Sequence, residues 1–209
     1  EPLETVDSAW DALAKGRVAG QRHFALTLTY HRLTRPPARI ANSFTTARTD
    51  FYIHQFKPLL KFLDNPGKRL LIADDVGLGK TIEAGYILRE LQAQQGSLER
   101  VLIVVPARLA PKWRRELRTR FDEHYDLVKG RDILRLCQRL RQGFEVDPFQ
   151  WITSYESIRP EEVREAIQEA QLTFDLLICD EAHRMRNPEA LQHQVEVALA
   201  DAADTVLFL

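Results

Sequence analysis

The chain has 209 residues, of which 44% are hydrophobic and 28% are charged, and its formal net charge at pH 7 is −1. This length and composition suit one α/β domain with a small extension, and the near-neutral charge alone does not point to a nucleic-acid partner. No apolar run approaches the ~20 residues that a membrane span needs, and no signal-peptide pattern opens the chain, so we expect a cytoplasmic protein without a membrane partner.

Residues 1–50 differ from the rest and are predicted to form an accessory extension. Apolar residues alternate with less apolar ones from Phe24 to Tyr30, as in a half-exposed strand, and Pro36-Pro37 then breaks the chain. Residues 12–49 are basic and contain no acidic side chain. Two interpretations stay open for this extension: the solvated face of a small β element, or a surface that contacts nucleic acid.

From residue 51 onward, short apolar runs typical of buried strands alternate with segments of helical period. This pattern favours an α/β fold with a mainly parallel sheet covered by helices on both faces. The expected strands are 69–74, 101–106, 149–155, 175–180 and 205–209. The expected helices lie around 84–91, 111–121, 163–170 and 188–203, and the stretch 122–148 is expected to hold a helix with loops.

The run Asp74-Asp75-Val76-Gly77-Leu78-Gly79-Lys80-Thr81 lies between an expected strand and an expected helix, the context that a phosphate-binding loop requires. Gly77 and Gly79 would let the backbone approach a phosphate group closely, and the positive end of the helix dipole would face the anion. Lys80 would reach the β- and γ-phosphates of ATP, and the Thr81 hydroxyl would bind Mg²⁺. The predicted nucleotide-binding residues of this loop are Val76, Gly77, Leu78, Gly79, Lys80 and Thr81.

A second motif supports this interpretation, because Asp74 stands where the strict phosphate-loop pattern has glycine. Asp180 and Glu181 directly follow the expected strand 175–180. Two buried carboxylates are costly without a role, and in a parallel sheet they would lie at the same edge as the phosphate loop. Asp180 can hold Mg²⁺ through water, and Glu181 can orient the water that attacks the γ-phosphate. Together with Lys80 they are the predicted catalytic residues.

At this point the sequence resembles the superfamily-2 helicases and, within them, the SWI/SNF-like ATPase family. The first RecA-like lobe of that family carries a loop of the form DExGLGKT, so its aspartate matches Asp74, while Asp75 replaces the usual glutamate. The run Asp180-Glu181-Ala182-His183-Arg184-Met185-Arg186-Asn187 is close to the family's extended form DEAHRxKN. The resemblance gives His183 a role in coupling.

Three further segments resemble motifs of the family in the same order. Gln55 matches the upstream glutamine that reads the adenine edge of ATP. The segments 106–116 and 153–156 resemble two motifs that lie on the nucleic-acid side, whereas Trp113 is expected to pack in the core. The residues that the resemblance places against nucleic acid are Arg108, Lys112, Ser154 and Tyr155.

The resemblance covers roughly residues 50 to 209 and implies a RecA-like ATP-binding lobe over 51–209 that uses ATP and Mg²⁺. Because the chain stops before the family's Thr-Ala-Thr-Pro motif, we expect a fragment whose parent supplies a second lobe. Without the arginines of that lobe, the fragment is expected to bind ATP weakly and to hydrolyse very little. The run 79–85 is more similar to bacterial members, of RapA-like or phage-defence type, and this suggests RNA polymerase or a defence complex as a further partner.

The predicted function is a motor ATPase that moves on nucleic acid, with double-stranded DNA as the expected track. A P-loop kinase or metabolic NTPase is the alternative, since the phosphate loop alone would suffice for it, but the ordered motifs from Gln55 to His183 argue against this alternative. A binding module with a decayed ATP site is disfavoured because the predicted catalytic residues are all present.

Overall fold

The structure is a computed structural model that describes residues 52–65, 67–73, 79–182, 197 and 199–209. The chain divides into two units, Glu1–Ile40 and Ala41–Leu209, and the described residues all belong to the second. The predicted basic extension 1–50 lies outside the described residues. The domain boundary at residue 50 therefore stays a prediction.

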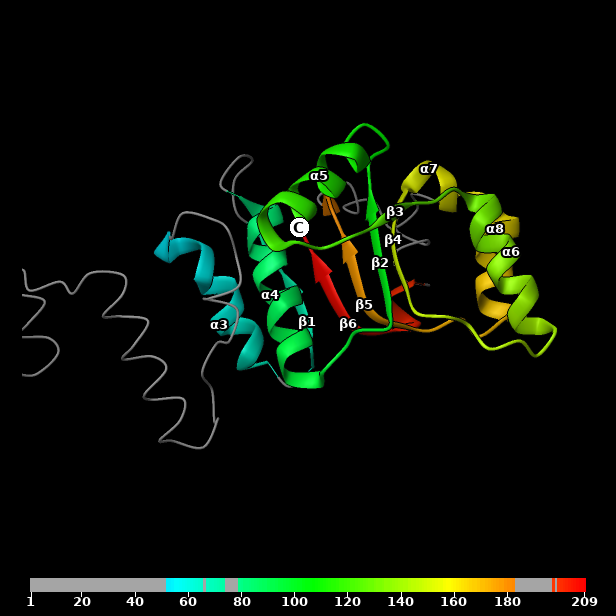
Figure 1. Cartoon of the computed structure of the whole chain (residues 1–209), viewed down its shortest axis with the longest axis horizontal. Coiled ribbons are helices and arrows are strands. Elements are labelled where there is room, and N and C mark those ends of the chain that lie inside the picture. Colours follow the sequence, from blue (N-terminus) through cyan, green and yellow to red (C-terminus); the bar gives the residue numbers. More distant parts are fainter. Residues whose placement is uncertain (1–51, 66, 74–78, 183–196, 198) are drawn as a thin grey trace, which may run out of the picture. The chain divides into compact units, whose positions relative to one another are not determined.

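A six-stranded sheet, parallel throughout, forms the centre of the described part of the chain, in the order β1-β6-β5-β2-β4-β3 (Figure 1). The strands are β1 (Arg69–Leu71), β2 (Arg100–Val105), β3 (Asp126–Leu127), β4 (Phe149–Ser154), β5 (Phe174–Cys179) and β6 (Ala203–Phe208). The predicted α/β fold is confirmed, and each of the predicted strands is present with shifted ends. The stretch 122–148 also contains β3, which the sequence pattern does not predict because two residues are too few to show an alternation.

Helices cover both faces of this sheet, with α3, α4 and α5 on one face and α6 and α8 on the other (Figure 1). The helical elements are the 3₁₀ helix η2 (Ile53–Phe56) and the α-helices α3 (Lys57–Leu63), α4 (Lys80–Gln95), α5 (Ala110–Phe121), α6 (Gly130–Arg141), α7 (Tyr155–Ile158) and α8 (Glu161–Glu169). The helix predicted at 188–203 lies mostly outside the described residues, and β6 already begins at Ala203. Over the described ranges, no helix is long and apolar enough to cross a membrane.

The central strand β2 is buried on both faces, which is why its sequence is a continuous apolar run. Val101, Ile103 and Val105 pack with α4 and α5, whereas Leu102 and Val104 face the layer of α6 and α8. Because every strand is parallel, all the strands end at the same edge of the sheet. The segments that follow β1, β2, β4 and β5 therefore gather along this carboxyl edge.

Helices α4 and α5 pack closely at Gly85 of α4. A Cβ atom on Gly85 would lie only 2.3 Å from the ring of Phe121, the last residue of α5. The Phe121 ring is fully buried and meets Tyr86 edge to face, with 5.7 Å between ring centroids. Glycine at this position therefore sets how near the two helices can approach, and both helices begin at the carboxyl edge.

Candidate functional site

The described part of the predicted phosphate loop is the start of α4. Gly79 is the N-cap of this helix, with a φ of 103°, a backbone conformation that favours glycine. Its carbonyl oxygen accepts hydrogen bonds from the N–H groups of Ile82 at 2.7 Å and Glu83 at 3.1 Å, which closes the first turn. Lys80 and Thr81 are the first two residues of the helix and are half-buried. Residues 74–78, which include the predicted Val76, Gly77 and Leu78, lie outside the described residues.

Gln55, the predicted adenine-edge residue, lies directly against this helix start. Its side chain comes from η2 and is 5% exposed. A Cβ atom on Gly79 would lie 2.5 Å from Gln55 Nε2, so a larger residue at this position would require the amide to move. The structure thus brings together two predicted nucleotide-binding positions from separate motifs. Gly79 is favoured by its φ angle, and its missing side chain lets Gln55 lie close to the helix start.

Asp180 and Glu181 follow β5 at the carboxyl edge, as predicted. The N–H of Asp180 donates to the Val104 carbonyl oxygen of β2 at 2.9 Å, and the N–H of Ala182 donates to the Leu209 carbonyl oxygen at 2.8 Å. Glu181 has a φ of 62°, a left-handed conformation that is uncommon for a residue with a side chain. Backbone strain of this kind occurs often at functional sites, where the surrounding contacts maintain it.

Trp113 contacts the carboxylate of Asp180, a contact that the sequence pattern does not predict. Its indole Nε1–H donates to Asp180 Oδ2 at 2.8 Å, and the N–H of Glu181 donates to Asp180 Oδ1 at 2.8 Å. Trp113 is 2% exposed, so the expectation of a core residue is confirmed. Its polar contact was missed because the partner is 67 positions away in the sequence. The sequence near Trp113 shows only that an indole donor lies in a segment expected at the carboxyl edge of the sheet.

The electrostatic surroundings of Asp180 connect it with Lys80. Burial raises the pKa of the Asp180 carboxyl above its ordinary value; the hydrogen bonds from Trp113 and from the Glu181 N–H oppose this, and the Glu181 charge adds to it. The Lys80 ammonium also lowers this pKa, although β6 separates β1 from β5 in the sheet. The Lys80 charge is thus the smallest of the influences on the Asp180 pKa, after burial, the two hydrogen bonds and the Glu181 charge.

The chemistry of these groups fits an ATP–Mg²⁺ site. Each carboxylate oxygen of Asp180 accepts one hydrogen bond from the residues named above and keeps a further lone pair for a cation. Thr81 adds a hydroxyl oxygen at the helix start, whose positive dipole end favours phosphate. In the described part of the chain, no group of three His, Cys, Asp or Glu side chains could hold a metal. A site with one or two protein ligands is typical of Mg²⁺ bound with phosphate.

The residues predicted to face nucleic acid follow β2 and β4 at the same edge. Arg108 and Lys112 are exposed at the start of α5, and Lys112 Nζ lies 3.9 Å from Glu116 Oε1. Ser154 is the N-cap of α7, where its hydroxyl oxygen accepts a hydrogen bond from the Ser157 N–H. Tyr155 is only 4% exposed, and its hydroxyl donates to the backbone oxygen of Asp180 at 2.8 Å. Tyr155 thus faces the carboxylate segment, and His183 lies outside the described residues.

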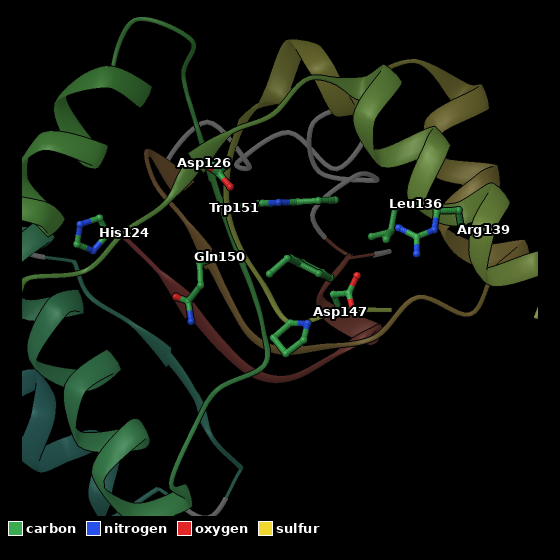
Figure 2. Close-up of a pocket in the computed structure, with 9 residues that line it drawn as sticks. His124, Asp126, Leu136, Arg139, Asp147, Gln150 and Trp151 are labelled. Carbon is green, nitrogen blue, oxygen red and sulfur yellow. The ribbon is translucent and has the colours of Figure 1, made fainter. Parts of the chain in front are cut away.

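A cavity of about 380 Å³ lies elsewhere, at the amino end of β4 (Figure 2). Trp151 stacks there on Phe149, with 4.3 Å between ring centroids, and Leu136 and Arg139 of α6 complete one wall. The other lining residues are His124, Asp126, Asp147, Pro148 and Gln150. This cavity is formed at the opposite end of the strand from Ser154 and Tyr155, and it takes no part in the carboxyl-edge site.

Comparisons with known proteins identify the family to which the chain belongs. A model of the SNF2-related domain matches residues 51–205. The RNA polymerase-associated protein RapA of Photobacterium profundum is 39% identical over 145 residues, which cover 68% of this chain and 14% of that protein. RapA of Proteus mirabilis is 32% identical over 213 aligned residues, covering 98% of this chain and 21% of that protein. The chain thus spans about a fifth or less of the length of these relatives.

Solved structures show the same fold. The Sulfolobus solfataricus SWI2/SNF2 ATPase core in complex with dsDNA superposes with a TM-score of 0.60, covering 78% of this chain and 32% of that one. The core domain of the same protein, solved separately, gives a TM-score of 0.58. Sequence identity is 17% and 18% in these two comparisons, so they support the fold alone.

Proposed function

Since the chain belongs to the SNF2-related domain family, we propose that it is the ATP-binding lobe of a motor ATPase that moves on double-stranded DNA. The observation that carries this proposal is that the helix start at Lys80, with Gln55 against Gly79, and the two carboxylates that follow β5 lie at the same edge of the parallel sheet. A site that only bound nucleotide would not need the second carboxylate. An NTPase or kinase without a nucleic-acid track is not favoured, because the family match extends over the segments that carry Arg108, Lys112 and Ser154.

Each residue has one role in the proposed site. Gln55 contacts the adenine edge, and Lys80, together with the backbone N–H groups of the helix start, holds the phosphates. Thr81 and Asp180 would hold Mg²⁺, which when bound neutralises charge on the phosphate oxygens. Glu181 orients the attacking water and accepts its proton at the carboxylate. Val76, Gly77 and Leu78 complete the proposed phosphate cradle, and His183 couples it to the rest of the protein.

The proposed track and partners draw on the relatives. One solved neighbour contains double-stranded DNA, and RapA is by name associated with RNA polymerase, so both are proposed as partners of the full-length protein. The chain spans about a fifth or less of these relatives, so we propose that turnover needs the remainder, including a second RecA-like lobe. The isolated chain should then bind ATP–Mg²⁺ weakly and hydrolyse very little. A cytoplasmic location stays a prediction.

Two substitutions in the full-length protein test the assigned roles. Lys80→Ala should weaken ATP binding about tenfold or more, because it removes the charge that holds the phosphates. Glu181→Gln should leave ATP affinity nearly unchanged and lower DNA-stimulated turnover by about 10²- to 10⁴-fold, because it removes the base. Nucleotide affinity by calorimetry and phosphate release would measure the two effects.

A matched control for the second variant is Glu165→Gln, which removes an exposed carboxylate from α8. It should change neither nucleotide affinity nor turnover. If Lys80→Ala and Glu181→Gln lost ATP binding equally, the division of roles would be wrong. If the native full-length protein showed no DNA-stimulated hydrolysis, the proposed function itself would be wrong.

A further inference from the structure

Asp180 is held by two side chains that come from the two segments assigned to the nucleic-acid side. Trp113 donates to its carboxylate and Tyr155 donates to its backbone oxygen, both at 2.8 Å. These side chains are 2% and 4% exposed, so neither hydrogen bond competes with bulk water. Asp180, the residue that would hold Mg²⁺, is therefore held by contacts from α5 and α7. These helices follow β2 and β4, which lie on the other side of β5 from β1, the strand that precedes Lys80.

Trp113 belongs to the same helical turn as the exposed basic residues. Arg108 lies in the turn between β2 and α5, which is closed by a hydrogen bond from the Leu109 N–H to the Pro106 carbonyl oxygen at 2.8 Å. The N–H of Trp113 in turn donates to the Leu109 carbonyl oxygen at 2.9 Å. Lys112 and Trp113 are neighbours, one exposed and the other buried against Asp180. A displacement of this turn therefore moves the indole donor.

Tyr155 is connected to the surface in a similar way. It is the first residue of α7, and Ser154 caps this short helix with its hydroxyl. The preceding residue, Thr153, is 1% exposed, and its hydroxyl donates to the Val128 carbonyl oxygen at 3.0 Å. The end of β4 is thus fixed on both sides of Ser154. A contact that displaces Ser154 would therefore also move Tyr155, whose hydroxyl donates to Asp180.

We propose that Trp113 and Tyr155 are positioning residues through which DNA bound at Arg108, Lys112 and Ser154 sets the position of Asp180. Trp113 orients its carboxylate, and Tyr155 holds its backbone. This rests on the proposed function and adds a mechanism by which the track controls the site. The coupling changes the affinity of the Asp180 carboxylate for Mg²⁺. The hydrogen-bond partners of a metal ligand fix its geometry, and their loss typically lowers metal affinity by about 10- to 100-fold. Neither residue touches nucleotide in this mechanism.

The test uses the full-length protein with Trp113→Phe and Tyr155→Phe. Each removes one donor and keeps an aromatic ring in place. The measurement is the affinity for a non-hydrolysable ATP analogue by calorimetry, with Mg²⁺ or with EDTA, and each with and without duplex DNA. In the native protein we expect DNA to increase the gain in affinity that Mg²⁺ provides. In both variants this gain should fall by about 10-fold or more and become independent of DNA, while affinity in EDTA and affinity for DNA stay unchanged.

The chain offers matched controls for both substitutions. Trp151→Phe alters the tryptophan that stacks on Phe149 in the distant cavity (Figure 2). Tyr125→Phe removes a hydroxyl from a tyrosine that is 4% exposed, as Tyr155 is. Both controls should behave as the native protein does in every nucleotide measurement. If Trp113→Phe does not fold, Tyr155→Phe carries the test, since it removes a single hydroxyl group.

The outcomes separate this inference from the proposed function. Equal losses of affinity with Mg²⁺ and with EDTA would show that Trp113 and Tyr155 only support the structure, and would overturn the inference. A DNA effect that survives both substitutions would also overturn it, while the proposed function would stand. If DNA had no effect on nucleotide affinity in the native protein and did not stimulate its hydrolysis, the proposed function would fail as well.

Discussion

The two halves of the carboxyl edge are built in different ways. The phosphate side, formed by Gly79, Lys80 and Thr81, is a helix start made of consecutive residues of one motif. The proposed nucleic-acid side, formed by the starts of α5 and α7, contacts Asp180 through hydrogen bonds between residues 67 and 25 positions apart. A motif therefore reveals which chemical groups a site contains. The connection between its two halves depends on tertiary packing.

Among the substitutions that compare the two sides, the largest effect is expected from Gly79→Ala, which disturbs the phosphate side. Alanine would have to adopt a φ of 103°, and its Cβ would lie 2.5 Å from Gln55 Nε2. Backbone strain alone costs about 1–3 kcal/mol, and the clash displaces Gln55 or the helix start. We expect a lower melting temperature and a loss of ATP affinity of about tenfold or more in the full-length protein, measured by thermal unfolding and calorimetry.

Gly96→Ala is the matched control for this substitution. Gly96 also has a positive φ, 91°, but a Cβ there would meet no atom within 4 Å. It lies at the other end of the same helix, so its substitution should lower stability through strain alone and leave ATP affinity unchanged. If both variants lost ATP affinity to the same degree, strain in α4 and not contact with Gln55 would be the cause.

The phosphate side could be predicted from sequence because its residues are local. Gly79, Lys80 and Thr81 stand at the start of a helix, as their motif predicts, and Asp180 and Glu181 stand at the end of a buried strand. The parallel order of the sheet then brings them to one edge. The strands could also be predicted from neighbouring residues, because a strand that is buried on both faces, such as β2, is a continuous apolar run.

The remaining features of the fold and the site leave no local pattern in the sequence. Nothing near Trp113 in the sequence shows that its indole donates to Asp180, and Tyr155 was expected at a surface although it is 4% exposed. No residue pattern indicates the left-handed backbone of Glu181, because residues other than glycine seldom adopt this conformation. The strand β3 has only two residues and shows no pattern at all.

A smaller effect is expected from Gly85→Ala, which disturbs the packing between the two halves. Alanine in a helix is normally more favourable than glycine by about 1 kcal/mol. Here its Cβ would lie 2.3 Å from the Phe121 ring, and overpacking of this kind costs about 1–3 kcal/mol. We expect net destabilisation in denaturant unfolding, together with weaker coupling between DNA and nucleotide, because α4 and α5 are forced apart.

Phe121→Leu supplies the second arm of a double-mutant cycle. Leucine is smaller than the ring that meets Gly85, so the added methyl group should be tolerated better in the Phe121→Leu background. The two substitutions should therefore cost less together than the sum of their separate effects. If the two changes in unfolding free energy were strictly additive, the Gly85→Ala variant would relax without moving Phe121. The contact between Gly85 and Phe121 would then not set the spacing of α4 and α5.

The smallest effect is expected on the exposed face of the nucleic-acid side, from Arg108→Ala combined with Lys112→Ala. Both side chains are exposed, and Lys112 makes only a weak pair with Glu116, so their removal should leave folding and DNA-free ATP affinity unchanged. Contacts with the phosphate backbone are electrostatic and insensitive to base sequence. We expect the full-length variant to bind unrelated duplexes more weakly by a similar factor. The slope of affinity against salt concentration should flatten by up to about two phosphate contacts.

The same charge can be removed elsewhere as a control, with Arg131→Ala combined with Arg135→Ala. These arginines are exposed on α6 and make equally weak pairs with Asp132, but they lie on the helix layer that does not carry Arg108. If binding depended only on total charge, both double variants would flatten the salt slope equally, and the assignment of Arg108 and Lys112 would fail. An effect confined to Arg108 and Lys112 would place the track beside the turn that carries Trp113. DNA would then bind next to the hydrogen bond that holds Asp180.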